Sequence, residues 1–156
     1  MESRKRILII SANPLNTTSN NGKTVASIFE TYPRELLAQL YFSDMVPDSG
    51  ICDNYYKISD MDMLKSRLSP KKGVCGACIR KMNINEQNME EPKNHRVMVR
   101  KNNFTRLLRE FVWNKNWRTD ELISWLDSFK PELVFFVAGD GVFSSKIAFY
   151  VIGRYQ

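Results

Sequence analysis

The chain has 156 residues, 43% of them hydrophobic, and a formal net charge of +6. This length suits a single domain, which buries roughly two-thirds of the surface that its unfolded chain exposes. The sequence contains no run of about 18 uncharged apolar residues, as a membrane-spanning helix requires, and no signal-peptide pattern. Three cysteines, an odd number, argue against a secreted disulfide framework. We therefore expect a single cytoplasmic domain.

The positive charge is concentrated in the middle of the chain. Between Lys65 and Arg118 there are 14 Lys or Arg and 4 Asp or Glu, a net charge of +10, so the remainder carries −4. Such a region favours an anionic partner, which would be acidic lipid, nucleic acid or a phosphorylated ligand. No nucleic-acid-binding motif accompanies the charge, so we do not expect nucleic-acid binding.

The first third of the chain has the pattern of a β-α-β unit. Residues 6–11 form a short continuous apolar run, typical of a strand buried on both faces. Residues 12–22 are mostly turn formers and small polar residues, which predict a loop. Apolar residues at helical spacing in 23–32 predict a helix that Pro33 ends, and 36–42 is apolar enough to be the next strand.

The middle of the chain is less regular. Residues 54–58 are a further predicted strand, and Ser59 is placed to cap a helix over 60–68, whose first turn is acidic. From about 70 to 101 the periodicity disappears, and Lys, Arg, Asn, Gly and Glu predominate. This composition indicates a basic insertion or long loop within the domain.

The last third returns to alternating elements. Helical spacing predicts helices over 104–117 and 119–129, the second capped by Thr119. Residues 132–137 are a near-continuous apolar run and predict a strand. A turn of small residues then leads into a last predicted helix over 142–152.

This alternation predicts an α/β fold, a Rossmann-like parallel sheet with helices on both faces, as one domain over residues 1–156. Ligands of such sheets bind beyond the carboxyl ends of the strands. The loops that contain Gly22 and Gly139 each follow a predicted strand, so we expect both at this edge.

Two parts of the chain resemble a known family. Residues 5–14 with the Asn-Asn-Gly-Lys-Thr sequence at 20–24, and the strand and turn at 130–140, are similar to the N-terminal, acceptor-side half of family-four GT-B glycosyltransferases. The resemblance implies a two-domain enzyme in which a C-terminal half holds a nucleotide-sugar donor. Because the chain ends before such a half, we expect it to be truncated, and incomplete and inactive as an isolated enzyme.

The resemblance further implies transfer of a sugar from a nucleotide-sugar donor to a glycan or lipid-linked acceptor, as in polysaccharide biosynthesis. We also expect a cytoplasmic protein with no metal or other cofactor, peripheral at the inner membrane face through the basic helix described below. The family's glycine-rich loop approaches the donor phosphates, and the matching residues here are Asn20, Asn21, Gly22 and Lys23. The family often has two glycines in this loop, whereas this chain has one.

Physical chemistry gives the same loop a binding role. Gly22 allows a positive φ and a close backbone approach, and a helix beginning there points free N–H groups at the crevice. Asn20, Asn21 and Lys23 would add side-chain donors for an anionic group. In the alternative interpretation Gly22 only makes a turn and Asn21 caps the helix.

Two other functional classes remain open. Gly22, Lys23 and Thr24 resemble the end of the phosphate-binding loop of a nucleotide hydrolase, although Thr17 stands where that motif has its first glycine. A non-catalytic α/β binding or regulatory domain is the other class.

Asp140 lies between Gly139 and Gly141, directly after a predicted buried strand. A carboxylate there could accept a proton or a hydrogen bond from an acceptor hydroxyl, so Asp140 is a candidate catalytic residue and Gly139 a candidate binding residue. An Asp-Gly pair is also typical of a simple turn.

Cys75 and Cys78 have the spacing of half a zinc site, and Cys52 and His95 could supply two more ligands. Because a structural zinc site normally shows a second close pair, we predict free thiols and assign no metal. A thioredoxin-like redox motif is disfavoured, since the pair does not open a helix after a strand.

The predicted helix that begins at 104 has two unlike faces. Its apolar face carries Phe104, Leu107, Leu108 and Phe111. Arg106, Arg109 and Trp113 fall on the opposite face, with Trp117 nearby. Basic residues beside exposed tryptophans are typical of a membrane interface, so these four residues predict an anionic membrane surface as a partner. The alternative is an amphipathic core helix whose arginines are solvated.

Overall fold

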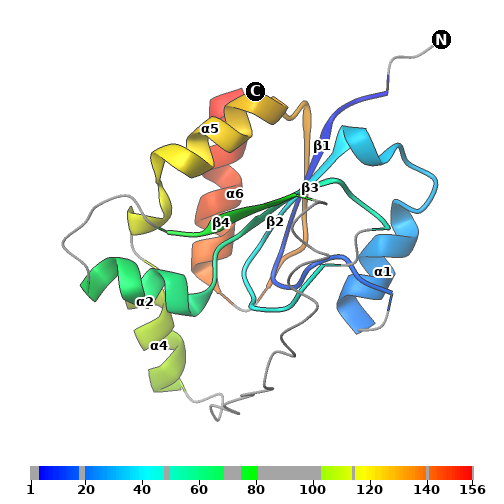
Figure 1. Ribbon diagram of the computed structural model, residues 1–156. Helices are drawn as coiled ribbons and strands as arrows, with labels where there is room; N and C mark the ends of the chain where they lie inside the picture. The colour runs from blue at the N-terminus through cyan, green and yellow to red at the C-terminus, as the bar shows by residue number, and fades with distance from the viewer. Residues whose placement is uncertain are drawn as a thin grey trace.

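One five-stranded sheet organises the molecule (Figure 1). The computed structural model describes residues 4–17, 20–47, 50–68, 75–80, 103–113, 115–139 and 141–155. The strands are β1 (Ile7–Ser11), β2 (Leu37–Tyr41), β3 (Asn54–Lys57), β4 (Ala77–Arg80) and β5 (Leu133–Phe136). Their order across the sheet is β4-β3-β2-β1-β5.

The centre of the sheet is parallel, as predicted. β1 pairs with β2 on one side and with β5 on the other, so that Ile9 lies between Gln39 and Phe135. All five residues of β2 and the last four of β1 are buried. Continuous burial of this kind is typical of largely apolar strands such as these two, in which Ser11 and Gln39 are the polar residues.

Helices surround the sheet and begin at recognisable caps. They are α1 (Asn20–Ile28), α2 (Asp60–Leu68), α4 (Asn103–Val112), α5 (Asp120–Phe129) and α6 (Val142–Tyr155), with short 3-10 turns η1 (Arg34–Leu36) and η2 (Lys115–Trp117). Ser59 and Asp62 cap α2 reciprocally, because the Ser59 hydroxyl accepts from the Asp62 N–H and the Asp62 carboxylate accepts from the Ser59 N–H. The Thr119 side chain accepts from the Leu122 N–H and begins α5 as predicted.

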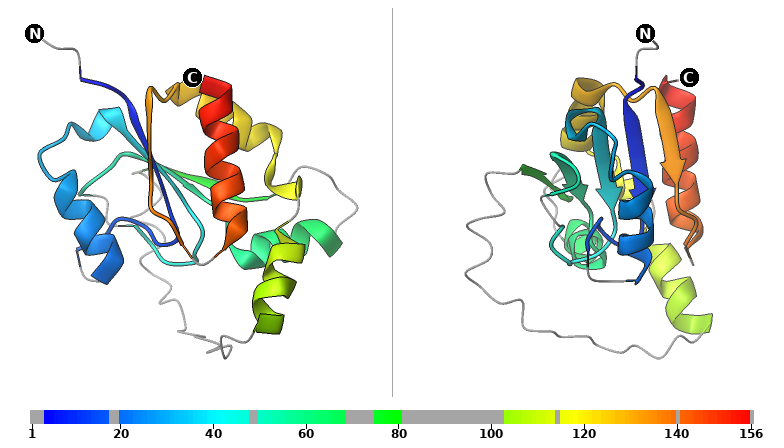
Figure 2. Two further views of the ribbon diagram at one scale, coloured as in Figure 1. Left: turned by 180° about the vertical axis from the view of Figure 1, so that it is seen from behind. Right: turned by 90° about the vertical axis from the view of Figure 1, so that its right-hand side faces the viewer.

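Both faces of the sheet are covered, and each has its own core (Figure 2). On one face Ile9, Leu37 and Tyr55 pack with Val25 and Phe29 of α1. On the other face, side chains of β1, β2 and β3 pack with α2, α5 and α6. The buried residues of this core include Leu8, Ile10, Leu40, Tyr56, Met63, Trp125, Leu126, Phe143 and Ile147. The prediction of an α/β fold with helices on both faces is confirmed.

The sheet is not wholly parallel, because β4 runs antiparallel to β3. This strand lies within the segment 70–101 that the sequence predicts as loop, and four residues at a sheet edge are too few to show a period. Gly76 precedes β4 with φ 89°, and a Cβ placed there would lie 2.6 Å from the Lys57 carbonyl oxygen. Only glycine fits such a position. The rest of the predicted loop lies outside the described residues.

Helix boundaries differ from the predicted ones by a few residues. α1 begins at Asn20, three residues earlier than predicted, and α6 continues to Tyr155. The predicted helix over 104–117 divides into α4 and η2. Within the described part of the chain, no helix has both the length and the apolar character needed to cross a membrane.

Candidate functional site

The candidate site is the edge of the sheet at the carboxyl ends of β1 and β5, where sheets of this kind have their binding crevice. The chain leaves β1 toward β2 on one side and returns to β5 on the other, which makes this the switch point of the sheet. A Cβ placed on Gly139, after β5, would lie 3.9 Å from the Cβ of Ala12, after β1, and both residues are exposed. The two predicted loops therefore lie side by side at this edge.

Gln39 fixes the loop that follows β1. Its side chain is fully buried in the middle of β2, and its amide nitrogen donates to the Ser11 hydroxyl (2.7 Å) and to the Asn13 carbonyl (3.1 Å). Its amide oxygen accepts from the Leu15 N–H at 2.9 Å. The Ser11 hydroxyl in turn donates to the Asn13 carbonyl at 2.8 Å. One side chain thus satisfies polar groups along residues 11–15 and sets the course of the loop.

Gly22 is required for close packing. It is buried in the first turn of α1, where a Cβ would lie 2.6 Å from the Pro14 carbonyl oxygen and 2.9 Å from the side-chain nitrogen of Asn16. Its φ is not positive, since Gly76 is the one described glycine with a positive φ. The predicted positive φ of Gly22 is wrong. The groups that approach Gly22 closely are Pro14 and Asn16 of the chain itself, so the close approach of a ligand stays a prediction.

The start of α1 presents the remaining predicted residues at the crevice edge. Asn20 and Asn21 form the first residues of the helix, and Lys23, one residue beyond Gly22, is exposed. The first N–H groups of a helix have no partner within the helix, so they and the positive dipole end can attract an anion. Asp140 lies outside the described residues, although its neighbour Gly139 is placed beside Ala12.

The second helix at this edge already has an acidic cap from elsewhere in the chain. A carboxylate oxygen of Glu110 in α4 accepts from the Val142 N–H at 2.6 Å and from the Phe143 N–H at 3.4 Å, both in the first turn of α6. This carboxylate occupies the position that an anionic ligand takes at a helix N-terminus. Of the two helices, α1 is therefore the better candidate for binding an external anion.

Tyr41 ends β2 at the same edge of the sheet. Its ring is fully buried against Tyr55, and its hydroxyl has no hydrogen-bond partner among the described residues. Burial raises the pKa of Tyr41, and the nearby carboxylates of Asp44 and Asp62 raise it further. The hydroxyl is thus a neutral group whose hydrogen-bonding capacity is unused.

The tryptophans predicted to be exposed are buried. Trp113 is 2% exposed, donates its indole N–H to the Asp60 carboxylate at 2.5 Å and stacks on Phe143 at 4.0 Å. Trp117 is 3% exposed and contacts the Tyr150 ring edge-on. The prediction that these two residues contact a membrane is wrong. Their indole rings are large apolar surfaces that pack into the core instead.

The orientation of α4 is the reverse of the one expected for a core helix. Arg109 donates to Asp60 at 2.9 Å and lies over the Phe143 ring, and Glu110 caps α6, so the polar side of α4 faces the protein. Leu107 and Phe111 on the apolar side are 70% and 64% exposed. Arg109 therefore does not belong to a solvated face, as the alternative interpretation requires, whereas Arg106 is exposed.

The cysteines do not assemble into a metal site. Cys52 is buried on the α1 face and donates its thiol to the Leu37 carbonyl, whereas Cys75 is buried on the opposite face beside Met63. Burial raises the pKa of Cys52 to about 12 and that of Cys75 to about 11. The described residues include no group of three or more potential metal ligands, and His95 lies outside them. The interpretation that joins Cys52 to Cys75 in a zinc site is wrong.

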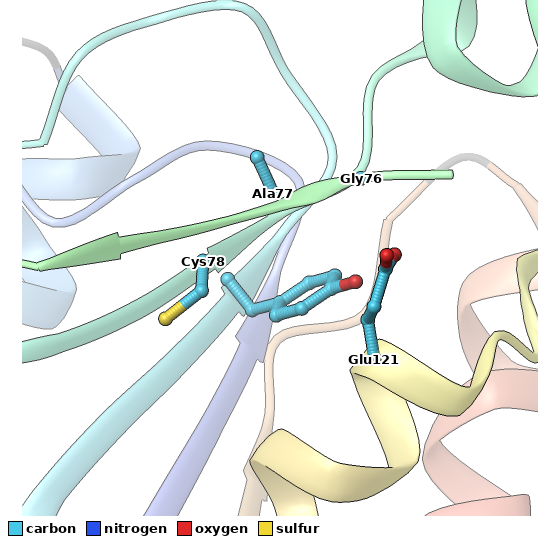
Figure 3. A pocket seen from close by; sticks show the side chains of 5 residues that line it. Gly76, Ala77, Cys78 and Glu121 are labelled. Atoms are coloured by element: carbon cyan, nitrogen blue, oxygen red, sulfur yellow. The ribbon is translucent and has the colours of Figure 1, made fainter. Parts of the chain in front are cut away.

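A shallow pocket of about 280 Å³ lies at the other edge of the sheet, between β4 and α5 (Figure 3). It is lined by Tyr56, Gly76, Ala77, Cys78 and Glu121. The Glu121 side chain points from α5 toward β4. Burial raises the pKa of the Tyr56 hydroxyl to about 12. None of the predicted site residues lines this pocket, and its few polar groups do not define a ligand.

Comparison of the chain with family models, with curated proteins and with solved structures gave no match. The sheet and its helices make the chain an α/β domain of Rossmann-like type. Because no relative was found, the function is inferred from the candidate site.

Proposed function

We propose that this chain is the acceptor-side half of a GT-B glycosyltransferase, which transfers a sugar from a nucleotide-sugar donor to a glycan or lipid-linked acceptor. The observation that supports the proposal most is the position of the β1–α1 loop. The segment with the family resemblance lies at the switch point of the sheet, where Gln39 holds it from inside.

In this proposal the first turn of α1 faces the donor phosphates. Asn20 and Asn21 begin the helix, Lys23 contributes an exposed positive charge, and Gly22 allows the loop and helix to approach closely. Gly139 follows β5 and lies beside Ala12, and Asp140, the next residue in the sequence, would accept a hydrogen bond from the acceptor hydroxyl. A further half would hold the nucleotide. We place such an enzyme in the cytoplasm, at the inner face of the membrane.

The phosphate-binding loop of a nucleotide hydrolase has less support from the geometry. Gly22, Lys23 and Thr24 lie in the first turns of α1, where this motif also has them, but Thr17 stands in place of its first glycine. The space beside Gly22 is filled by the Pro14 carbonyl and by the side chain of Asn16. The hydrolase remains as a distinct outcome of the experiment below.

The test is an assay of the product of the whole reading frame with uridine- and guanosine-diphosphate sugars, in which release of nucleoside diphosphate is followed with and without membrane glycolipid. We expect acceptor-dependent release. The Gly22→Ala variant should lower kcat/KM roughly tenfold or more, because its Cβ displaces the loop. Gly153→Ala is the matched control, since a Cβ on Gly153 meets nothing within 4 Å.

Circular dichroism of both variants separates an effect on the site from a failure to fold. Hydrolysis of ATP that depends on magnesium, with no turnover of any nucleotide sugar, would contradict the proposal and favour the hydrolase. Equal loss of activity in both variants would show that the position of Gly22 has no special role.

A further inference from the structure

Helix α4 turns an apolar face away from the protein. Leu107, Leu108 and Phe111 are 70%, 51% and 64% exposed, and their spacing puts them on one side of the helix. The opposite side is tied down, because Arg109 bonds to Asp60 and Glu110 bonds to the first turn of α6. The apolar side is therefore held outward by specific polar contacts.

Helix α2 extends this surface. It packs beside α4, and the Arg67 guanidinium lies 3.9 Å from the centre of the Phe111 ring. Leu64 and Leu68, one turn apart on α2, are 40% and 77% exposed. An exposed surface with this many large apolar side chains on two adjacent helices is typical of an interaction site. We call it the α2–α4 surface, defined by Leu64, Leu68, Leu107, Leu108 and Phe111.

The charge around the α2–α4 surface is positive. Lys65 and Arg106 are exposed and Arg67 is partly exposed, whereas the acidic residues of these helices, Asp60, Asp62 and Glu110, each accept hydrogen bonds from other residues. Apolar side chains bordered by basic ones are the composition of a helix that lies in the interface of an anionic membrane.

We infer that the α2–α4 surface docks on an anionic membrane. A second copy of the chain would bring the same positive charges against it. Like charges disfavour this occupant, whereas acidic lipid complements the surface. The inference names the surface through which the proposed enzyme would reach the membrane, and it is argued from these exposed residues without the catalytic proposal.

The place of the surface in the fold suits this role. α4 projects beyond the carboxyl edge of the sheet, with α2 beside it (Figures 1 and 2). The switch-point crevice opens at the same edge. A domain docked through α4 would thus turn the crevice toward the lipid.

The test is flotation of the chain with vesicles of phosphatidylcholine alone and of phosphatidylcholine mixed with phosphatidylglycerol. We expect binding to the mixed vesicles only, weakened by salt. The double variant Leu107→Ser, Phe111→Ser should lower the partition coefficient by roughly tenfold or more, since each side chain loses its burial in lipid. Phe149→Ser is the matched control, because Phe149 is 72% exposed on α6, outside this surface.

A pair of charge variants tests the electrostatic part. Lys65→Glu should lower binding at least about fivefold, whereas Lys146→Glu, an equal change at an exposed site on α6, should have a smaller effect. Sedimentation of the same samples reports self-association.

Three results would overturn the inference. The first is no flotation with anionic vesicles, and the second is equal binding to neutral ones. The third is a dimer that Leu107→Ser, Phe111→Ser dissociates, which would assign the surface to a second copy. A loss of nucleotide-sugar turnover with membrane binding intact would instead count against the proposed function alone.

Discussion

Replacing Gln39 by leucine tests whether one buried amide holds the loop that follows β1. The substitution keeps a side chain of similar size in the centre of β2 but removes three hydrogen bonds, to Ser11, Asn13 and Leu15. The Asn13 carbonyl retains the Ser11 hydroxyl as a donor. The Leu15 N–H, in contrast, loses the Gln39 oxygen and is left buried.

The three lost hydrogen bonds set the expected decrease in the free energy of unfolding. An unsatisfied buried N–H costs about 1–3 kcal/mol, and each other lost hydrogen bond costs about 1 kcal/mol. The free energy of unfolding of Gln39→Leu should therefore be about 3–5 kcal/mol lower than that of the wild type. For a domain of this size, such a loss lowers Tm by roughly 6–20 °C.

Tyr41→Phe is the matched control in the same strand. It also removes a buried polar atom, but the Tyr41 hydroxyl has no partner among the described residues. Removing a buried hydroxyl without a partner should leave stability unchanged or raise it by about 1 kcal/mol. Urea unfolding followed by far-ultraviolet circular dichroism measures both variants. A loss below 1 kcal/mol in Gln39→Leu, or an equal loss in Tyr41→Phe, would refute the reasoning.

Two further predictions concern a helix cap and a buried thiol. Glu110→Ala should lower the free energy of unfolding by about 0.5–2 kcal/mol, because the first turn of α6 loses its hydrogen-bond acceptor. Glu110→Gln should lower it less, because the amide oxygen can still accept a hydrogen bond from the Val142 N–H, and thermal unfolding of both variants measures the difference. Cys52 ionises near pH 9.0 when unfolded, but its pKa is about 12 in the fold, so the folded state retains the proton and stability falls as pH rises above about 9. Urea titrations across this range should show a shallower fall of stability with pH for Cys52→Ala than for the wild type, and parallel curves for the two proteins would contradict the assignment.

The elements that the sequence predicted correctly are those with local signals. Residues 6–11 are a continuous apolar run, and Ser59 and Thr119 are caps whose partners lie three residues away. Each of these features is specified within one short segment. Local signals of this kind predict three strands, β1, β2 and β5, and the starts of two helices, α2 and α5.

The features that could not be predicted depend on residues far apart in the chain. Arg109 and Asp60 are separated by 49 positions, and Glu110 and Val142 by 32. These contacts decide which side of α4 faces the protein, and an amphipathic pattern states only that two sides differ. Gln39 had a weaker signal, as a lone amide inside an apolar strand. The roles of Asn20, Asn21, Lys23 and Asp140 in binding stay predictions.

The unequal distribution of aromatic residues over the two faces has an optical consequence. All three tryptophans, Trp113, Trp117 and Trp125, belong to the core on the face of α5 and α6. Intrinsic tryptophan fluorescence therefore reports the loosening of that face directly, whereas the α1 face, which contains Gln39, can change without altering the emission. A difference between the fluorescence and circular dichroism melting curves would reveal that the cores on the two faces of the sheet unfold at different temperatures.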